Sequence, residues 1–261
     1  MTVLILGADS HGRTDSIMVV GIDPIRKRVS FASIPRDTVN IPLPGGGTFT
    51  NHKINEYYNA AAKQPQKYRQ GPGRATADAI GALLGIKIDY YARTNFPGFV
   101  ALVNSVGGVP ITLPAAVSDN FLQVGPNSFG FTFPKGQQKL DGRKALIFVR
   151  IRHQDTDFDR QRRQQQFLTA AGLFMLKRHD LTPLLLAAAA KNLETDFPVG
   201  RLATYQAAMA GIDPAQIGGV VLGPSRYESK ATCPCGYALA PKLKEIRAKA
   251  AELFPWAVPG H

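Results

Sequence analysis

An α/β architecture is the fold class that this sequence of 261 residues predicts. Segments with the two-residue period of strands alternate with segments of helical period along most of the chain. Hydrophobic residues make up 44% of the chain and charged residues 19%, as in ordinary globular proteins, and no stretch is of low complexity. The length allows one large domain or two small ones, and we expect a single domain over residues 1–261.

The N-terminal third predicts three strands and then two helices. Apolar residues near the N-terminus follow the strand pattern, which predicts strands at 3–6, 16–22 and 28–33 with a turn at Asp23-Pro24. Helical spacing follows at 55–62 and again at 76–84. Gly85 is placed to end the second helix.

The rest of the chain continues the alternation. Its patterns predict strands at 89–94, 109–113 and 220–222, and helices at 96–105, 157–177, 183–193, 199–209 and 241–253. Residues 120–138 carry glycine and proline and predict a long loop or hairpin, which could form a lid. The short apolar run at 145–149 predicts a buried strand that leads into Arg150.

The charge balance indicates an anionic partner. Lys and Arg number 31 against 19 for Asp and Glu, a formal net charge of +12 and a pI of about 9.9. Nucleic acid, an anionic membrane surface and a phosphorylated small molecule all fit this sign. The longest apolar run, within residues 181–193, is far short of the roughly 20 residues that span a bilayer. The N-terminus shows no basic and apolar signal segment, so we expect any natural anchor to be missing from this sequence.

The two cysteines, Cys233 and Cys235, stand in Thr-Cys-Pro-Cys-Gly near the C-terminus. With no histidine nearby they cannot complete a four-ligand zinc site. A turn with free thiols and a local disulfide are both consistent with this spacing.

The most concentrated charge lies between residues 150 and 163. The segment carries Asp155, Asp157 and Asp159 among five arginines: Arg150, Arg152, Arg160, Arg162 and Arg163. On a strand end, Arg150 and Arg152 would point two guanidinium forks to one side of a sheet, and two forks can hold one diphosphate. Thr156 or Asp157 is a plausible N-cap of the next helix, on which Arg160 and Gln164 would share a face. The alternative is a solvated surface of aspartate–arginine pairs.

Two further loops carry charged residues where strands end. The first, at residues 7–15, places Asp9 and Asp15 on either side of Arg13 among glycines. Carboxylates beside a phosphate need a cation, and Mg²⁺ is typically held by one or two carboxylates plus substrate phosphates. Asp9 and Asp15 are therefore candidate metal ligands, with turn formation as the alternative role. The second loop, at residues 33–37, carries Arg36.

Other common site signatures are absent from the sequence. There is no Gly-rich phosphate loop ending in Lys-Ser/Thr and no Gly-x-Ser-x-Gly motif, and the five histidines are scattered. Phosphate chemistry carried by arginines and a metal is what remains.

Taken together, these motifs resemble the LytR-CpsA-Psr family, which transfers glycopolymers from a polyprenyl diphosphate carrier to the bacterial cell wall. The resemblance covers the first two thirds of the chain and is clearest within residues 1–180. It runs through Leu4-Ile5-Leu6-Gly7-Ala8-Asp9, Gly12-Arg13-Thr14-Asp15, Ser33-Ile34-Pro35-Arg36-Asp37, Lys53-Ile54-Asn55, Val106-Gly107-Gly108-Val109, Leu140-Asp141-Gly142 and residues 150–165.

The resemblance implies a fold and a location. The fold is a mixed central β-sheet flanked by helices on both faces, with a hydrophobic pocket for the lipid tail. Residues 168–176 and 183–193 are candidates to line that pocket, with ordinary core packing as the alternative. The family's domain lies outside the cytoplasm behind an N-terminal membrane anchor, and residues 181–261 would complete the domain with helices.

The resemblance also implies a site. Asp9 and Asp15 would hold Mg²⁺ or Mn²⁺. The diphosphate would be bound by Arg13, Arg36, Arg150, Arg152, Asp157, Arg160 and Gln164. Asp15, Arg13, Arg36 and Arg152 would be catalytic, with Asp15 or Asp9 able to accept a proton.

We therefore predict a metal-assisted transferase that moves a glycan to peptidoglycan or a similar wall acceptor. A hydroxyl of the acceptor would attack the sugar-bearing phosphorus, and polyprenyl phosphate would leave. The alternatives are a pyrophosphatase acting on the same lipid, a non-catalytic carrier or regulator, and a nucleic-acid-binding protein. We disfavour nucleic acid, because the arginines alternate with aspartates and lack interleaved aromatic residues.

Overall fold

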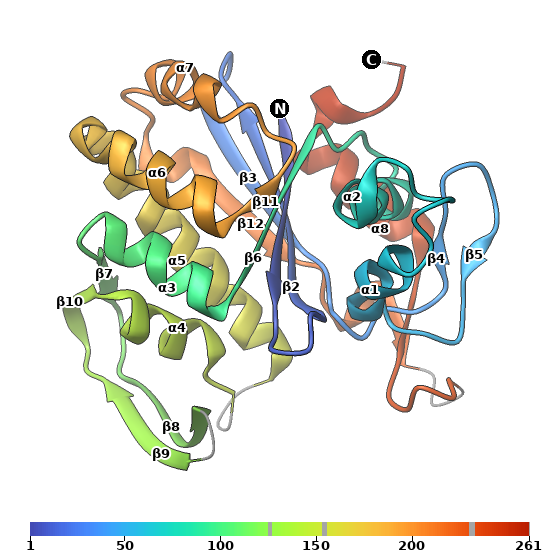
Figure 1. Ribbon diagram of the computed structural model, residues 1–261, viewed down its shortest axis with the longest axis horizontal. Coiled ribbons are helices and arrows are strands. Elements are labelled where there is room, and N and C mark those ends of the chain that lie inside the picture. The colour runs from blue at the N-terminus through green and yellow to red at the C-terminus, as the bar shows by residue number, and fades with distance from the viewer. Residues whose placement is uncertain (125–126, 153–155, 230–232, 261) are drawn as a thin grey trace. The chain divides into compact units, whose positions relative to one another are not determined.

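The computed structural model describes residues 1–124, 127–152, 156–229 and 233–260, and the chain forms two compact units (Figure 1). The first comprises Met1–Asn95, Leu193–Arg201 and Gly211–His261, and the second comprises Phe96–Asn192 and Leu202–Ala210. The expectation of one catalytic domain over residues 1–261 stays a prediction.

A six-stranded mixed sheet forms the centre of the first unit, in the order β11-β6-β1-β2-β3-β12. Its strands are β1 (Thr2–Ala8), β2 (Thr14–Asp23), β3 (Arg28–Ser33), β6 (Tyr90–Asn95), β11 (Glu194–Thr195) and β12 (Ile217–Val221). Strand β1 pairs antiparallel with β2 and parallel with β6, so the carboxyl ends of β1 and β6 meet at the same edge. Together with the eight α-helices of the described residues, this sheet confirms the predicted mixed α/β fold.

Helices pack on the sheet of the first unit. Alternate side chains of β1, among them Leu4 and Leu6, are fully buried, as the two-residue period requires. Helix α2 (Gly71–Leu84) contacts β6, α8 (Leu243–Leu253) contacts β3, and the two helices contact each other. The short helix α1 (Tyr57–Ala62) follows a 3-10 turn at Ile54–Glu56 and contacts α2.

The ends of α2 have clear causes. Gly85 adopts a φ of 69° and ends the helix as predicted, because glycine enters this left-handed region without steric cost. The helix begins at Gly71, earlier than predicted, since Pro72 near its first position is already in helical geometry and lacks an N–H that would go unpaired.

The first unit is completed by two short hairpins, β4 (Ile41–Pro42) with β5 (Thr48–Phe49), and β13 (Tyr227–Ser229) with β14 (Leu239–Pro241). The last helix therefore begins after Pro241 rather than at it. Between β13 and β14, Cys233 and Cys235 form a disulfide, which decides between the two alternatives that their spacing left open.

The second unit combines helices with two small antiparallel sheets. Its helices are α3 (Phe96–Ser105), α4 (Gly142–Arg150), α5 (Asp157–Lys177), α6 (Thr182–Asn192) and α7 (Leu202–Ala208). Strand β7 (Val109–Leu113) pairs with β10 (Gly136–Leu140), and β8 (Val117–Val124) pairs with β9 (Asn127–Phe133). The segment predicted as a loop or hairpin thus contains the β8–β9 hairpin. Its role as a lid stays a prediction.

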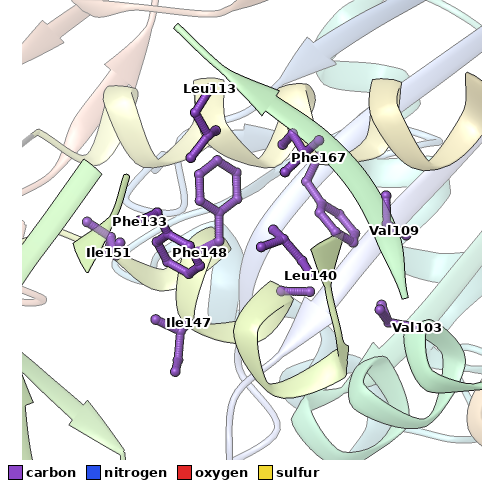
Figure 2. Close-up of a cluster of buried hydrophobic side chains, with 11 residues drawn as sticks. Val103, Val109, Leu113, Phe133, Leu140, Ile147, Phe148, Ile151 and Phe167 are labelled. Atoms are coloured by element: carbon purple, nitrogen blue, oxygen red, sulfur yellow. The ribbon is translucent and has the colours of Figure 1, made fainter. Parts of the chain in front are cut away.

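A buried hydrophobic cluster holds α4 and α5 in place within this unit. Figure 2 shows Phe148 of α4 between Phe133 and Leu113, with Phe167 of α5 nearby. The rings of Phe133 and Phe148 meet edge to face with centroids 5.5 Å apart. The residues that follow α4 and begin α5 are therefore attached to a rigid core.

The prediction of a buried strand at 145–149 is wrong, because these residues lie within α4. An apolar run of this length fits a buried strand and a buried helix equally well. The deciding signal lies upstream, where the Asp141 side chain caps the helix by accepting from the Lys144 N–H at 2.8 Å. Arg150 is consequently the last residue of a helix, and Arg150 and Arg152 do not alternate along a strand.

Among the residues that the structure describes, helices long and apolar enough to span a bilayer are absent.

Candidate functional site

A tight turn after β1 places Asp9 and Arg13 in direct contact. Asp9 Oδ1 accepts the backbone N–H groups of His11 and Arg13 at 2.8 and 2.9 Å. Its Oδ2 accepts Arg13 Nε at 3.0 Å and lies 2.9 Å from Arg13 Nη2. Burial opposes ionisation of Asp9, but these hydrogen bonds outweigh it and hold the pKa of the carboxyl below its usual range. The turn therefore presents an ionised aspartate already paired with arginine.

Asp15 lies at an irregularity in the β1–β2 pairing. The register passes from Gly7 opposite Ser16 to Ala8 opposite Thr14, so Asp15 is the extra residue of a β-bulge. Bulges redirect a side chain and are frequent beside active sites. Asp15 Oδ2 contacts Arg36 Nη1 at 2.5 Å, and its Oδ1 accepts Asn55 Nδ2 at 3.0 Å. The bulge thus joins the predicted residues Asp15 and Arg36.

A second ion pair lies next to this one along the chain. Lys53 Nζ donates to Asp37 Oδ1 at 2.7 Å, and Asp37 Oδ2 is 3.9 Å from Arg36 Nε. We call the carboxylates and cations of the first unit, namely Asp9, Arg13, Asp15, Arg36, Asp37 and Lys53, the hairpin region. Three acidic and three basic side chains balance within it.

Arg93 of β6 supports the turn from one side. Its guanidinium lies 4.0 Å from the Tyr58 ring centroid, 3.4 Å from Glu194 Oε2 and 3.5 Å from the Gly12 carbonyl oxygen. Glu194 also accepts the Tyr58 hydroxyl at 2.6 Å. Burial, together with this hydrogen bond, raises the pKa of Tyr58, which keeps the phenol protonated.

Chemistry favours Mg²⁺ or Mn²⁺ at the hairpin region, since carboxylate and amide oxygens are the ligands these ions prefer. Asn55 Oδ1, beside Asp15, is buried and accepts no hydrogen bond from the residues that the structure describes. Clusters of three or more His, Cys, Asp or Glu side chains suited to a metal are absent from the same residues. One or two carboxylates can hold Mg²⁺ when substrate phosphates supply further ligands, so the donor atoms are of the right chemical type, and Asp9 and Asp15 as metal ligands remain a prediction.

The remaining predicted ligands lie where α4 ends and α5 begins, in the second unit. Arg150 stacks over the Phe96 ring with its guanidinium carbon 4.5 Å from the centroid. The backbone N–H of Arg152 donates to the buried Asp119 carboxylate at 3.0 Å, while its side chain is 45% exposed and 3.8 Å from Asp157 Oδ1. We call residues 150–152 and 156–164 the helix-junction region.

Helix α5 begins with a capping box in which Thr156 and Asp159 each bond the other's backbone N–H. This confirms Thr156, rather than Asp157, as the N-cap. Arg160 Nη2 lies 2.8 Å from Asp157 Oδ1, and Gln164 Nε2 donates to the Val149 carbonyl at 3.3 Å.

The sequence interpretation missed several residues that hold these regions together. They are Asn55 and Arg93 in the first unit, and Asp119 and Arg163 in the second, where Arg163 donates to the Ile151 carbonyl. The sequence carried a signal for two of them: Asn55 is part of the Lys53-Ile54-Asn55 motif, and Arg163 is part of the arginine-rich segment. Asp155 and His153 lie outside the described residues.

Each unit thus brings together part of the predicted site. The hairpin region contains Asp9, Arg13, Asp15 and Arg36, and the helix-junction region contains Arg150, Arg152, Asp157, Arg160 and Gln164. That both sets bind one diphosphate stays a prediction.

Known proteins resemble the chain in both sequence and structure. It is 30% identical over 251 residues to the polyisoprenyl-teichoic acid–peptidoglycan teichoic acid transferase TagV of Bacillus subtilis (strain 168), covering 88% of this chain and 61% of TagV. It is 35% identical over 175 residues to the regulatory protein MsrR of Staphylococcus aureus (strain COL), covering 64% of this chain and 47% of MsrR. The chain therefore spans about half to three fifths of the length of these relatives.

The fold comparison agrees with the sequence comparison. The crystal structure of B. subtilis TagV matches with a TM-score of 0.71 at 25% identity, covering 98% of this chain and 97% of that one. The LytR_cpsA_psr family model matches residues 1–232. Because this match takes in nearly the whole sequence, including both regions described above, the chain belongs to the LytR-CpsA-Psr family.

Proposed function

We propose that this protein transfers a glycopolymer from a polyprenyl diphosphate carrier to peptidoglycan or a similar wall acceptor. The observation that carries the proposal is that all five predicted diphosphate-binding arginines lie in the hairpin and helix-junction regions of a chain similar to TagV, which is named as a polyisoprenyl-teichoic acid–peptidoglycan teichoic acid transferase. They are Arg13, Arg36, Arg150, Arg152 and Arg160. In this proposal the protein works at the outer face of the membrane, to which an N-terminal anchor attaches it.

The proposed reaction is a displacement at phosphorus. An acceptor hydroxyl oxygen forms a bond to the sugar-bearing phosphorus, and the bond from that phosphorus to the bridging oxygen breaks. The electron pair leaves with polyprenyl phosphate, and the hydroxyl proton passes to a carboxylate, for which Asp15 is the candidate. The arginines stabilise the negative charge that develops on the phosphate oxygens.

A divalent cation fits the proposal. Asp9 and Asp15 would hold Mg²⁺ or Mn²⁺, which would supply further positive charge to the diphosphate. Pairing with the metal and with arginines explains how two carboxylates can belong to a site that binds an anion.

The decisive test is Arg152→Ala. This side chain is 45% exposed, and its ion pair with Asp157 is long, at 3.8 Å. Such exposed pairs contribute little to stability, so removal of the side chain should leave the melting temperature nearly unchanged. We expect roughly 100-fold weaker binding of a short-chain polyprenyl diphosphate by calorimetry, because a guanidinium–phosphate fork is lost. Arg162→Ala is the matched control, since Arg162 is 67% exposed and pairs with Asp159.

Product analysis then separates the activities. Glycan linked through phosphate to the acceptor supports transfer, whereas release of glycan phosphate to water indicates a pyrophosphatase. Tight binding with no turnover indicates a carrier or regulator. Unchanged binding and turnover in Arg152→Ala would refute the proposed site.

A further inference from the structure

A surface pocket of about 580 Å³ lies beside the Asp9–Arg13 turn, entirely within the first unit. One wall is the turn itself, with His11 and Arg13. Phe49 of β5, His52, Asn59 of α1 and Lys63 just beyond that helix also line the pocket. The volume is within the range of small-molecule sites and is ample for one sugar ring.

Two of the lining side chains form an aromatic surface. The Phe49 and His52 rings stack at 21° with centroids 5.4 Å apart. The Tyr57 and Phe49 rings lie nearly perpendicular with centroids 4.9 Å apart, and Tyr57 is itself buried, so Phe49 is held in position. The face of an aromatic ring carries partial negative charge. It therefore attracts the slightly positive C–H groups that one face of a pyranose presents.

Polar groups surround this aromatic surface. Asn59 Nδ2 donates to the His11 carbonyl at 3.2 Å, which ties helix α1 to the turn. Glu56 pairs with His52 at 2.9 Å, and Gln64 lines the same pocket. An apolar ring bordered by amides and charged groups suits a ligand with C–H faces and a rim of hydroxyls.

The position of the pocket adds a second argument. Arg13 belongs both to the pocket wall and to the predicted diphosphate ligands. A sugar joined to the diphosphate, or an acceptor sugar that attacks it, must come close to that phosphate. A sugar-sized pocket sharing an arginine with the phosphate ligands meets this requirement.

We propose that this pocket binds a single pyranose ring stacked on Phe49, from either the first sugar of the donor or the acceptor glycan. The inference rests on the proposed function and names the place of the sugar in it. Phe49 acts as a specificity residue and takes no part in the chemical step.

The test measures the binding of three probes to the full chain by calorimetry. They are a short-chain polyprenyl diphosphate, the same lipid carrying N-acetylglucosamine, and a free disaccharide fragment of peptidoglycan. Phe49→Leu removes the aromatic face and keeps most of the bulk, and Phe49→Tyr is the matched control that keeps the face. A circular-dichroism melt checks that both variants fold.

If the donor sugar occupies the pocket, the sugar-bearing lipid binds roughly tenfold tighter than the bare lipid, the size of one aromatic contact. Phe49→Leu then abolishes that difference, and Phe49→Tyr retains it. If the acceptor sugar occupies it, Phe49→Leu instead weakens binding of the free disaccharide by a similar factor. Either result supports the inference.

The inference is overturned if Phe49→Leu, folded as the wild type, leaves the affinities for both sugar-bearing probes unchanged. Failure of the proposed function shows differently. If the proposed function is wrong, the wild-type chain binds neither lipid diphosphate. Binding of the free disaccharide still tests the pocket in that case.

Discussion

The hairpin region and the helix-junction region are held by similar contacts but differ in charge balance. In the hairpin region each arginine is paired with a carboxylate, Arg13 with Asp9 and Arg36 with Asp15. In the helix-junction region Arg160 and Arg162 also pair with carboxylates. The main chain there is held in addition, because Asp119 accepts the Arg152 N–H and Arg163 donates to the Ile151 carbonyl. The hairpin region is balanced in charge, whereas residues 150–163 carry five arginines against three aspartates.

This difference assigns different tasks to the two regions. A balanced region offers a diphosphate little net attraction until a cation joins its carboxylates. A region with excess arginine should attract phosphate directly, and Arg152, which is 45% exposed, is our candidate for this role. Cation dependence should therefore originate in the hairpin region.

The largest effect we expect is from Asp15→Asn. Transfer should fall about 100- to 10,000-fold, the usual contribution of a positioned proton acceptor. Mg²⁺ should no longer stimulate the residual activity, because the amide is neutral and a weaker ligand. Initial rates measured across a Mg²⁺ titration check this outcome.

Asp157→Asn is the matched control from the helix-junction region. Its carboxylate pairs with Arg160 at 2.8 Å, so diphosphate binding should weaken while stimulation by Mg²⁺ persists. Full stimulation by Mg²⁺ in Asp15→Asn would remove the distinction between the two regions.

The next effect is on stability and concerns Arg163. Arg163→Leu removes the bond to the Ile151 carbonyl from a side chain that is only 8% exposed. A hydrogen bond from a charged group is worth about 2 kcal/mol, which lowers the melting temperature of a chain this size by about 6 °C. Arg162→Leu, at an exposed position one residue earlier, should change stability by less than about 0.5 kcal/mol. Equal melting temperatures would show that the main chain of the junction is held by other contacts.

The sequence predicted the long regular elements well and the side-chain partners poorly. Helix α3 and strand β7 have the predicted bounds. Each shows its own period in the sequence, and Gly107 and Gly108 form a clear break between the two. Residues 145–149 were misassigned because five apolar residues show no period that separates strand from helix.

Side-chain partners depend on contacts that spacing does not encode. Asn55 reaches Asp15 across 40 positions of sequence, and Asp119 reaches Arg152 across 33. The motifs that resemble the family named the charged residues of the predicted site without indicating which groups hold them.

The smallest effect concerns the acid range and Asp9. The folded-state pKa of Asp9 lies below the ordinary 3.8, so the stability that its ionised form contributes is present above that pH and is lost as pH falls through the folded value. Asp9→Asn should cost about 1 kcal/mol at pH 7, because the charge-assisted bonds to Arg13 become neutral ones. The difference from wild type should shrink as pH falls below 3.8 and vanish below the folded-state pKa, where the folded wild-type side chain is neutral as well. Urea unfolding at both pH values measures it.

Ser10→Ala serves as the control within the same turn. Ser10 is exposed and contacts the His11 ring at 3.3 Å, so its loss should matter by less than about 0.5 kcal/mol and show no trend in the acid range. A stability difference for Asp9→Asn that stays constant between pH 7 and pH 3 would mean that the carboxylate holds the turn by shape alone. The hydrogen bonds that the side chain at position 9 accepts from the backbone N–H groups of His11 and Arg13 would then hold the turn without its charge.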